Sequence, residues 1–434
     1  MEAITVGIMG IIVLLLVLFL LGMPVGFAMA VIGFCGFSYV VSLKAALNMV
    51  GTDVWLTFSK YGLTVIPLFV FMGYLAFNAG IAERLYDAAY KWVGHWPGGL
   101  AMATIGADEF FAAICGSNSA TAATMGAVAL PQMTKYNYDT RLSSGTVVTG
   151  GTLGTIMPPS VVLIVIGLQT EQSIARLFLG GIIPAILLGL LFLLSIFVIC
   201  RVNPKYGPPG PRTGFKEKIR SLSGIIEAAT IFALVIGGLY FGVFTPTEAG
   251  AVGVLFTFIV AVASRRLSWQ GMVSSVKDTM KISCMVFVLV TGAIIFGRFL
   301  AVTRIPFMVA EFAAGLPVSR YVILAFVLSI YLLGGCVMDS LGFLVLTIPI
   351  FFPLGEAFGF DPVWYSIILT MVTTMGAITP PVGVNIYVVK GLAPDIGLGR
   401  IFKSASFFLL ACIICIALLI LFPGIVLVIP KMAG

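Results

Sequence analysis

The sequence predicts an all-α, polytopic membrane protein built from two inverted-topology repeats, and three observations lead to that prediction. Of the 434 residues, 60% are hydrophobic and only 9% are charged, with a mean hydropathy of +1.15, whereas about a quarter of the residues in a soluble domain are charged. Apolar stretches of membrane-spanning length recur along the chain, and similar motifs return after a fixed interval. Lipid must therefore be the solvent for most of the protein surface.

The apolar stretches fit transmembrane helices better than barrel strands. About 20 helical residues cross a hydrocarbon core of about 30 Å, whereas barrel strands are about 10 residues long and alternate in polarity. The first stretch lacks a basic leading segment and a convincing cleavage site, so we expect a retained helix rather than a signal peptide. The clearest stretches are 5–22, 24–42, 62–79, 178–200, 224–242, 247–263, 282–301, 321–338 and 404–422.

The residue types argue against an enzyme, a zinc or haem protein and a nucleotide-binding protein. His95 is the only histidine, and the seven cysteines are scattered without a CxxC pair, so soft metal ligands are too few. The sequence contains no GxxxxGK[ST] motif for ATP. An intramembrane enzyme would need a nucleophile–base pair or a metal cluster, and the sequence offers neither. We therefore expect no enzymatic activity, no organic cofactor and no nucleic-acid partner.

Motifs of the first half return in the second half at a single fixed offset, which aligns position 154 with position 376. The strongest match joins Gly154–Pro159 to Gly376–Pro381, and both segments carry the rare Pro-Pro pair. Several matches at one offset indicate an internal repeat. Further aligned pairs are 22–24 with 244–246, 130–131 with 352–353, and 138–139 with 360–361.

The charges in the loops predict that the two halves are inverted relative to each other. Loop 201–220 carries six basic residues and one acidic residue, and loop 264–281 carries four basic residues, so the positive-inside rule places both in the cytoplasm. The counterpart of the second loop, 42–59, carries only Lys44 and Asp53 and is expected on the opposite side. Inversion then places both termini in the periplasm. Inverted repeats are typical of alternating-access secondary transporters.

We expect each repeat to contain scaffold helices, an interfacial arm, and a re-entrant hairpin followed by a broken transmembrane helix. The arm is predicted from 81–93, where apolar residues recur at helical spacing opposite charged ones. In the first repeat, 1–202, the three parts are 1–80, 81–98 and about 99–170. A cytoplasmic linker follows at 203–223. In the second repeat, 224–434, the parts are 224–301, 302–320 and about 321–391, with a last helix at 404–429.

Each repeat interrupts a long apolar segment with Gly, Thr and Pro-Pro, at 150–160 and at 373–383. Proline lacks an N–H and clashes with the carbonyl four residues earlier, so two in a row release carbonyls from the helix. Released carbonyls can bind Na⁺, and the N-terminus of the half-helix that follows favours a carboxylate. Irregular backbone at membrane depth must be buried or line a cavity. These breaks are therefore the expected location of the chemistry.

Two polar segments, 115–121 and 337–342, are each followed by an apolar stretch too short to cross the bilayer alone. This pattern predicts the tips of two re-entrant hairpins, and their side-chain oxygens suit a hard cation. Asp339 is an isolated carboxylate in apolar sequence, which is functional by default, and it could hold Na⁺ or take up a proton. The tip residues that align at the offset are Ser117 and Asn118 with Asp339 and Ser340.

Other charged residues near apolar sequence are expected to have structural roles. Asp108 and Glu109 belong to this group, although their depth in the membrane is open. Glu248 begins an apolar helix, where a carboxylate favours the helix dipole. Arg298 could bind an anion, or its side chain could extend to the membrane surface. The sequence leaves both possibilities open.

With these features in place, the chain resembles the large membrane subunit (M subunit) of tripartite ATP-independent periplasmic (TRAP) transporters over essentially its whole length. The wider ion-transporter superfamily shares only the plan of hairpins and broken helices. The motifs that carry the resemblance are 116–123, 154–160, 242–249 and 378–385.

The resemblance implies an elevator-type fold of the ion-transporter superfamily, a bacterial inner-membrane location and Na⁺-coupled uptake of an organic acid such as a dicarboxylate or sialic acid. It implies two or more coupling Na⁺ ions. It also implies two protein partners, a periplasmic substrate-binding protein (P type) and a small four-helix membrane subunit (Q type). The open alternative is a stand-alone Na⁺- or H⁺-coupled anion or carboxylate porter. Only the chain's dependence on those two partners would distinguish a tripartite transporter from such a porter.

The resemblance also implies where Na⁺ and the substrate bind. One Na⁺ site would use Ser117, Asn118, Gly154, Met157 and Pro158. The other would use Asp339, Ser340, Gly376, Thr379 and Pro380. The substrate would lie between the two sites, near Ser119, Ser160, Thr379, Gly383 and Asn385. The two cation sites differ chemically, since only the second hairpin tip carries a carboxylate.

Overall fold

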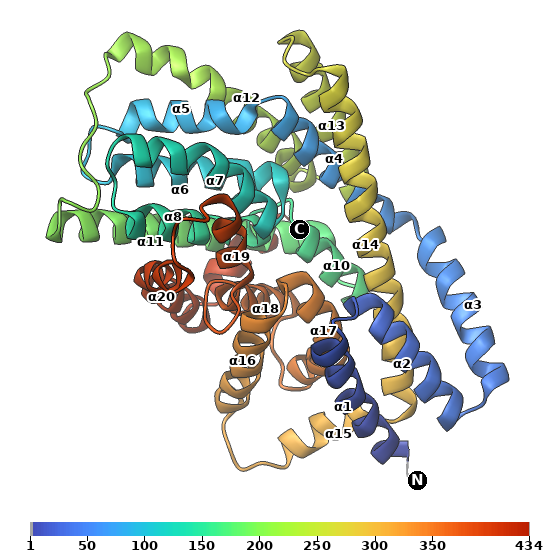
Figure 1. Ribbon diagram of the computed structural model, residues 1–434. Helices are drawn as coiled ribbons and strands as arrows, with labels where there is room; N and C mark the ends of the chain where they lie inside the picture. The colour runs from blue at the N-terminus through green and yellow to red at the C-terminus, as the bar shows by residue number, and fades with distance from the viewer. Residues whose placement is uncertain (1–2, 434) are drawn as a thin grey trace.

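The computed structural model describes residues 3–433, and the regular secondary structure in that range consists of helices without a strand (Figure 1). Ten helical segments are long and apolar enough to cross a membrane, which confirms the prediction of an all-α polytopic membrane protein. The helices of the first half are α1 (Ala3–Leu21), α2 (Val25–Val40), α3 (Leu43–Ser59), α4 (Val65–Asn78), α5 (Ile81–Val93), α6 (Gly99–Cys115), α7 (Asn118–Lys135), α8 (Thr140–Gly150), α9 (Leu153–Ile156), α10 (Val161–Thr170) and α11 (Ile174–Val202).

The second half matches the first half in the register of its hairpin and break region. Helices α7 and α17 begin at positions that the sequence offset aligns and also end at aligned positions, and α8 and α18 begin at aligned positions. The helices are α12 (Phe215–Tyr240), α13 (Pro246–Ala263), α14 (Trp269–Val302), α15 (Ile305–Ala314), α16 (Arg320–Val337), α17 (Ser340–Ala357), α18 (Pro362–Gly376), α19 (Val384–Leu392), α20 (Leu398–Leu421) and α21 (Gly424–Met432).

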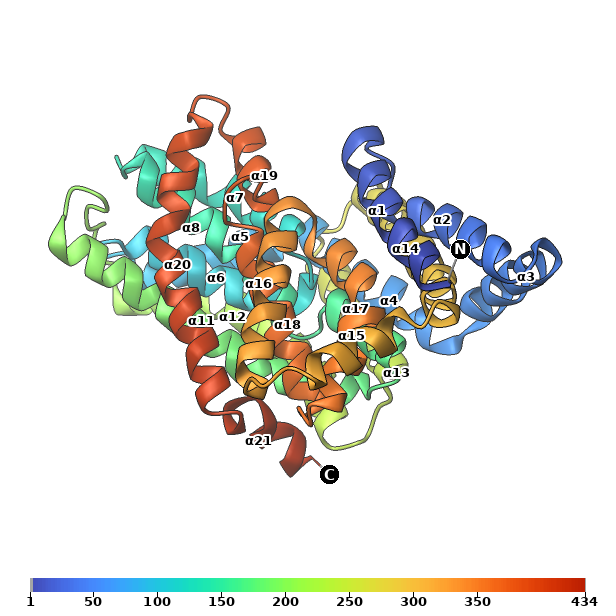
Figure 2. The same cartoon turned by 90° about the horizontal axis from the view of Figure 1, so that it is seen from below.

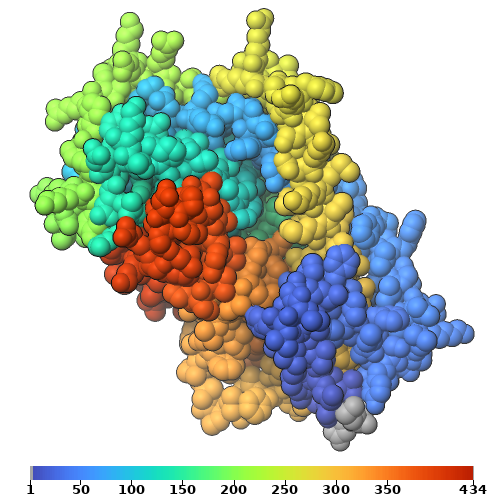
Figure 3. All heavy atoms as spheres, viewed as in Figure 1, coloured from blue at the N-terminus to red at the C-terminus, as the bar shows by residue number. Residues whose placement is uncertain are grey.

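The long helix α14 runs along one side of the molecule and packs against α2, α3 and α4 of the first half (Figure 1). Seen from below, α1–α3 lie at one edge and α8, α11 and α20 at the other, with α16–α18 between them (Figure 2). Long side chains project at the upper edge from the light-green segment near residue 220 and the yellow segment near residue 270 (Figure 3). The end of loop 201–220 and loop 264–281 therefore lie along the same edge of the molecule.

Two predicted boundaries differ from the structure. Helix α12 begins at Phe215, inside the expected linker 203–223, and Glu217 in its first turn favours the helix dipole. The expected single helix at 404–429 is two helices, because Pro423 has no N–H to donate to the carbonyl of Leu419. The indole N–H of Trp364 donates to that carbonyl instead, at 2.9 Å.

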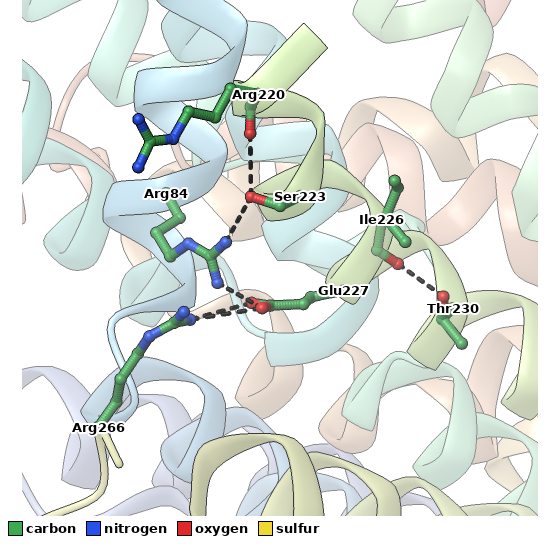
Figure 4. Close-up of polar contacts among 7 residues, drawn as sticks. All are labelled: Arg84, Arg220, Ser223, Ile226, Glu227, Thr230 and Arg266. Atoms are coloured by element: carbon green, nitrogen blue, oxygen red, sulfur yellow. Dashed lines mark hydrogen bonds and ion pairs between the residues drawn. The ribbon is translucent and has the colours of Figure 1, made fainter. Parts of the chain in front are cut away.

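A cluster of charged residues braces α5 of the first half against the second half (Figure 4). The guanidinium of Arg84 pairs with Glu227 on α12 and donates to the hydroxyl of Ser223 at 2.7 Å. Arg266, between α13 and α14, reaches the same carboxylate at 3.2 Å. Glu227 is therefore the shared acceptor of two arginines, and its side chain is only 19% exposed.

Glu227→Gln should lower the free energy of unfolding by about 1–3 kcal/mol, because the two arginines lose their shared charged acceptor and repel each other. The thermal unfolding midpoint of the detergent-purified protein measures this loss. Asp87→Asn is the matched control, since Asp87 pairs with Lys91 within α5 at 2.6 Å and is 54% exposed, so that change should cost only about 0.5 kcal/mol or less. Equal midpoints for the two variants would contradict the bracing role.

Candidate functional site

The first break lies between α8 and α10. Helix α8 ends at Gly150, α9 forms a single turn, and the chain leaves the helical conformation before α10 begins. Ser160 closes the break, since its hydroxyl donates to the carbonyl of Thr155 at 2.5 Å and accepts from the N–H of Leu163 at 3.4 Å. The helix is therefore interrupted within the expected segment, 150–160, and Ser160 caps the half-helix that follows.

The first hairpin tip touches this break directly. Gly116, which ends α6, has a φ of +63°, and its carbonyl accepts the N–H of Val161 at 3.3 Å. A Cβ on Gly116 would collide with the carbonyl oxygen of Pro159, and a Cβ on Gly154 would lie 2.5 Å from the carbonyl oxygen of Ser117. Only glycine at both positions lets the tip and the break meet backbone to backbone.

Asn118 joins the two halves of the molecule at the hairpin tips. Its buried amide lies between the hydroxyl of Thr155 and the hydroxyl of Ser340, which is 3.4 Å away. Positions 118 and 340 are a pair that the sequence repeat aligns. The two hairpin tips therefore contact each other through equivalent residues, which the sequence alone did not predict.

The second tip and the second break repeat the arrangement. The carbonyl of Cys336, near the end of α16, accepts the N–H groups of Val382 and Gly383 at 3.1 and 2.9 Å. A Cβ on Gly376 would lie 2.5 Å from the backbone of Gly335. The hydroxyl of Thr379, in the break, donates to the carbonyl of Met375 at 2.8 Å. This tip also meets its break through backbone atoms.

Asp339 is exposed in the structure and caps α17, where its carboxylate accepts the N–H of Leu341 at 3.1 Å. One oxygen thus has a structural partner, and the carboxylate remains accessible beside Ser340.

Asn385, by contrast, is fully buried, and its amide donates to the carbonyl of Val148 on α8 at 3.1 Å. Because the N–H of Thr152 donates to Thr149 instead, the first break frees the Val148 carbonyl for this bond between the halves.

Two threonines that were not predicted as site residues belong to this region. The hydroxyl of Thr121 is fully buried beside Gly154 and has no hydrogen-bond partner within residues 3–433. Thr155 bonds the amide of Asn118. Helical spacing in the sequence could have indicated Thr121, because it lies one helical turn after Ser117. The carbonyl of Ser117 faces Gly154 as well.

The remaining predicted residues occupy the same region with fewer contacts. Met157 is buried, and its N–H donates to the carbonyl of Leu153 at 2.9 Å. Pro158 packs near Gly181 of α11, and Pro380 is exposed. Ser119 is half-buried on α7, and its hydroxyl forms no hydrogen bond with the described part of the chain. These four residues belong to the breaks and to the helix that follows the first tip.

The donor set at the tips consists of carbonyl, hydroxyl, amide and carboxylate oxygens. Within the described residues, no three His, Cys, Asp or Glu side chains converge, so thiolate and imidazole ligands for a transition metal are lacking. Oxygen donors of this kind suit a hard cation such as Na⁺. Ser117, Thr121 and Asn118 are the tip residues that lie against the first break and would supply such oxygens.

The other charged residues near apolar sequence have different surroundings. Asp108 is fully buried with its carboxylate against Gly150, and the Glu109 carboxylate lies against Gly189 of α11, with no hydrogen-bond partner for either in residues 3–433. Glu248 forms a reciprocal capping box with Thr245, which confirms its role at the helix start.

Arg298 pairs with a buried carboxylate of the scaffold. Its guanidinium lies 3.4 Å from the carboxylate of Asp53 on α3. The sequence had left open an anion site or a side chain reaching for the membrane surface. The contact with Asp53 gives Arg298 an intramolecular partner and connects α14 to α3.

Comparison with known proteins agrees with this architecture. The family model described as "Tripartite ATP-independent periplasmic transporter, DctM component" matches residues 12–425. The chain is 32% identical to the C4-dicarboxylate TRAP transporter large permease protein DctM of Pseudomonas aeruginosa, over 87% of this chain and 88% of that protein. It is 29% identical to the sialic acid TRAP transporter large permease protein SiaM of Vibrio cholerae, over 95% of each chain.

Two further similarities extend this comparison. The structure of the Alcanivorax borkumensis YdaH transporter superposes with a TM-score of 0.64 at 14% identity, over 88% of this chain and 89% of that one, which shows a shared fold. The isethionate TRAP transporter permease protein DctMQ of Oleidesulfovibrio alaskensis is 32% identical over 86% of this chain and 59% of its own length. The matched family consists of transporter permeases of the bacterial inner membrane and not of enzymes. The chain therefore belongs to the DctM family, the large membrane subunits of tripartite ATP-independent periplasmic transporters.

Proposed function

We propose that this chain imports an organic acid across the inner membrane, with Na⁺ as the coupling ion and a periplasmic binding protein as the donor of the substrate. The observation that carries the proposal is the meeting of the two hairpin tips, where Asn118 contacts Ser340 beside both helix breaks. Carbonyls released at the breaks and the hydroxyl and amide groups at the tips form oxygen-rich surroundings for a hard cation. Two such junctions support two coupling ions.

The substrate class rests on the relatives and on the helix ends. The relatives described above are named for C4-dicarboxylates, sialic acid and isethionate, so an organic acid is the shared chemistry. Helices α10 and α19 begin directly after the two breaks, and a helix N-terminus favours a carboxylate. We place the acid between those two ends, near Ser160 and Asn385.

We further propose that the halves are inverted repeats and that transport is an elevator motion. The matching register of α7 and α17 supports the repeat. The end of loop 201–220 lies along the same edge as loop 264–281 (Figure 3), which supports a cytoplasmic position for both, and hence periplasmic termini. The moving body would be α6–α10 with α16–α19, and the scaffold would include α1–α4 and α12–α14.

The partners follow from the tripartite family. A P-type binding protein would deliver the acid, and a small four-helix Q-type subunit would complete the membrane part. The relative named DctMQ supports the second partner, since it is longer than the region that this chain matches.

Reconstitution tests the proposed function. The chain, a small subunit and candidate binding proteins are placed in liposomes, and acid uptake is followed with and without an inward Na⁺ gradient. We expect uptake only when all three proteins and the gradient are present. Uptake by the chain alone would instead identify a stand-alone porter.

A further inference from the structure

An apolar groove lies on the outer surface where α5, α6 and α11 meet. Its volume is about 340 Å³, and its lining includes Trp92, Trp96, Gly106, Leu194 and Phe197. The two tryptophans are 39% and 49% exposed, so the groove is open at this end. The proposed cation and substrate sites do not use these residues.

Basic side chains gather at the tryptophan end of the groove. The ammonium of Lys218 lies 5.8 Å from the centre of the Trp92 ring, and the ring of His95 lies edge-on to Trp96, with 6.0 Å between centroids. Partial burial and the nearby positive charges of Lys218 and Arg212 lower the pKa of His95. Lys218 therefore lies at this end of the groove.

These two cations are not neutralised by the protein. In the described part of the chain, neither Lys218 nor Arg212 forms an ion pair, whereas Lys91 on α5 pairs with Asp87 at 2.6 Å. The linker that carries Arg212 is held on the turn between α5 and α6, since the N–H of Gly210 donates to the carbonyl of Gly94 at 2.8 Å. This bond places the linker segment two residues before Arg212 beside the tryptophan end of the groove.

We propose that this groove binds one anionic phospholipid, with an acyl chain along α5, α6 and α11 and the phosphate beside Lys218 and Arg212. An apolar slot with uncompensated cations at one end complements an acyl chain joined to an anionic headgroup. Tryptophans are enriched at the membrane interface, and basic clusters on the cytoplasmic side attract anionic headgroups. Lys218 and Arg212 both belong to the basic segment 201–220, which the positive-inside rule assigns to that side.

Native mass spectrometry of the purified chain, incubated with equal amounts of phosphatidylglycerol and phosphatidylcholine, tests the charge at the rim. We expect phosphatidylglycerol to be retained about tenfold more than phosphatidylcholine. The double variant Lys218→Gln/Arg212→Gln should bring that ratio close to one. Equal retention of the two lipids by the unaltered chain, or an unchanged ratio in the double variant, would overturn the proposal.

Gly106→Leu tests the groove itself. A Cβ on Gly106 meets nothing within 4 Å, so the leucine should fill the groove without displacing the backbone and should reduce phosphatidylglycerol retention about tenfold. Gly237→Leu is the matched control, since Gly237 lines a second apolar groove of about 370 Å³ and its Cβ position is equally open. Equal losses of phosphatidylglycerol in both variants, or no loss in either, would show that this groove does not bind the lipid.

A second readout separates a lipid from a protein helix as the occupant. The same measurement is made on the chain purified together with its small membrane subunit. Retained phosphatidylglycerol that remains sensitive to Gly106→Leu supports the lipid. Complete exclusion of lipid by the small subunit would show that the groove is a subunit contact, which overturns the proposal without affecting the proposed transport function.

Discussion

Asp339→Asn should reduce Na⁺-driven uptake by roughly 100-fold, equivalent to about 2.7 kcal/mol, and should leave the fold intact. Asp339 caps α17 by accepting the N–H of Leu341 at 3.1 Å, and an asparagine oxygen can accept the same bond. The change therefore removes only the negative charge, which is the only one at either hairpin tip. Uptake into proteoliposomes at a fixed Na⁺ gradient measures the loss, and gel filtration of the variant checks the fold.

Asp361→Asn is the matched control for this variant. Asp361 also caps a helix of the second half, α18, by accepting the N–H groups of Val363 and Trp364 at 2.9 and 3.1 Å. It lies at the opposite end of α18 from the break. We expect its uptake to remain within about twofold of the unaltered protein. Normal Na⁺-driven uptake by Asp339→Asn would remove Asp339 from the cation site.

Gly154→Ala should destabilise the protein by about 1–3 kcal/mol and abolish its stabilisation by Na⁺. The added Cβ would lie 2.5 Å from the carbonyl oxygen of Ser117, which already accepts the N–H of Thr121 at 3.0 Å and begins the α7 ladder. Neither backbone can yield without separating the tip from the break. The measurement is the thermal unfolding midpoint with and without Na⁺, because a bound ion stabilises only the state that binds it.

Gly391→Ala controls for the loss of a glycine. Gly391 lies in α19, and a Cβ there meets nothing within 4 Å, so alanine should be neutral or stabilising by up to about 1 kcal/mol. It should also keep the full Na⁺-induced shift of the midpoint. An unchanged Na⁺ shift in Gly154→Ala would show that the contact between tip and break does not form the cation site.

Much of the helical architecture could be predicted because the signals are local. The breaks at 150–160 and 373–383 each carry a Pro-Pro pair, which releases carbonyls from a helix, and the tips at 115–121 and 337–342 are polar segments between apolar stretches. The arm at 81–93 was equally predictable from its periodicity, and α5 has those bounds. The boundary of the last helix was wrong although its cause is local, because Pro423 has no N–H to donate to the carbonyl of Leu419. Only the structure shows that Trp364 donates to that carbonyl instead.

The composition of the site was less predictable than its location. Nothing in the sequence indicates that Asn118 meets Ser340, or that Asn385 reaches α8, because both contacts depend on how the two halves pack. Thr121 was overlooked, since a threonine in a helix usually bonds its own backbone four residues earlier. Only the structure shows that its buried hydroxyl lacks such a partner within the described range.

The central claim is that Na⁺ bound where tips and breaks meet drives the uptake of an organic acid. The most direct measurement follows radioactive Na⁺ and the acid together, in proteoliposomes containing this chain, its small subunit and a loaded binding protein. We predict that at least two Na⁺ ions enter with each acid molecule, and that both fluxes stop in Asp339→Asn. Acid accumulation without Na⁺ entry, driven equally well by a proton gradient alone, would contradict the account.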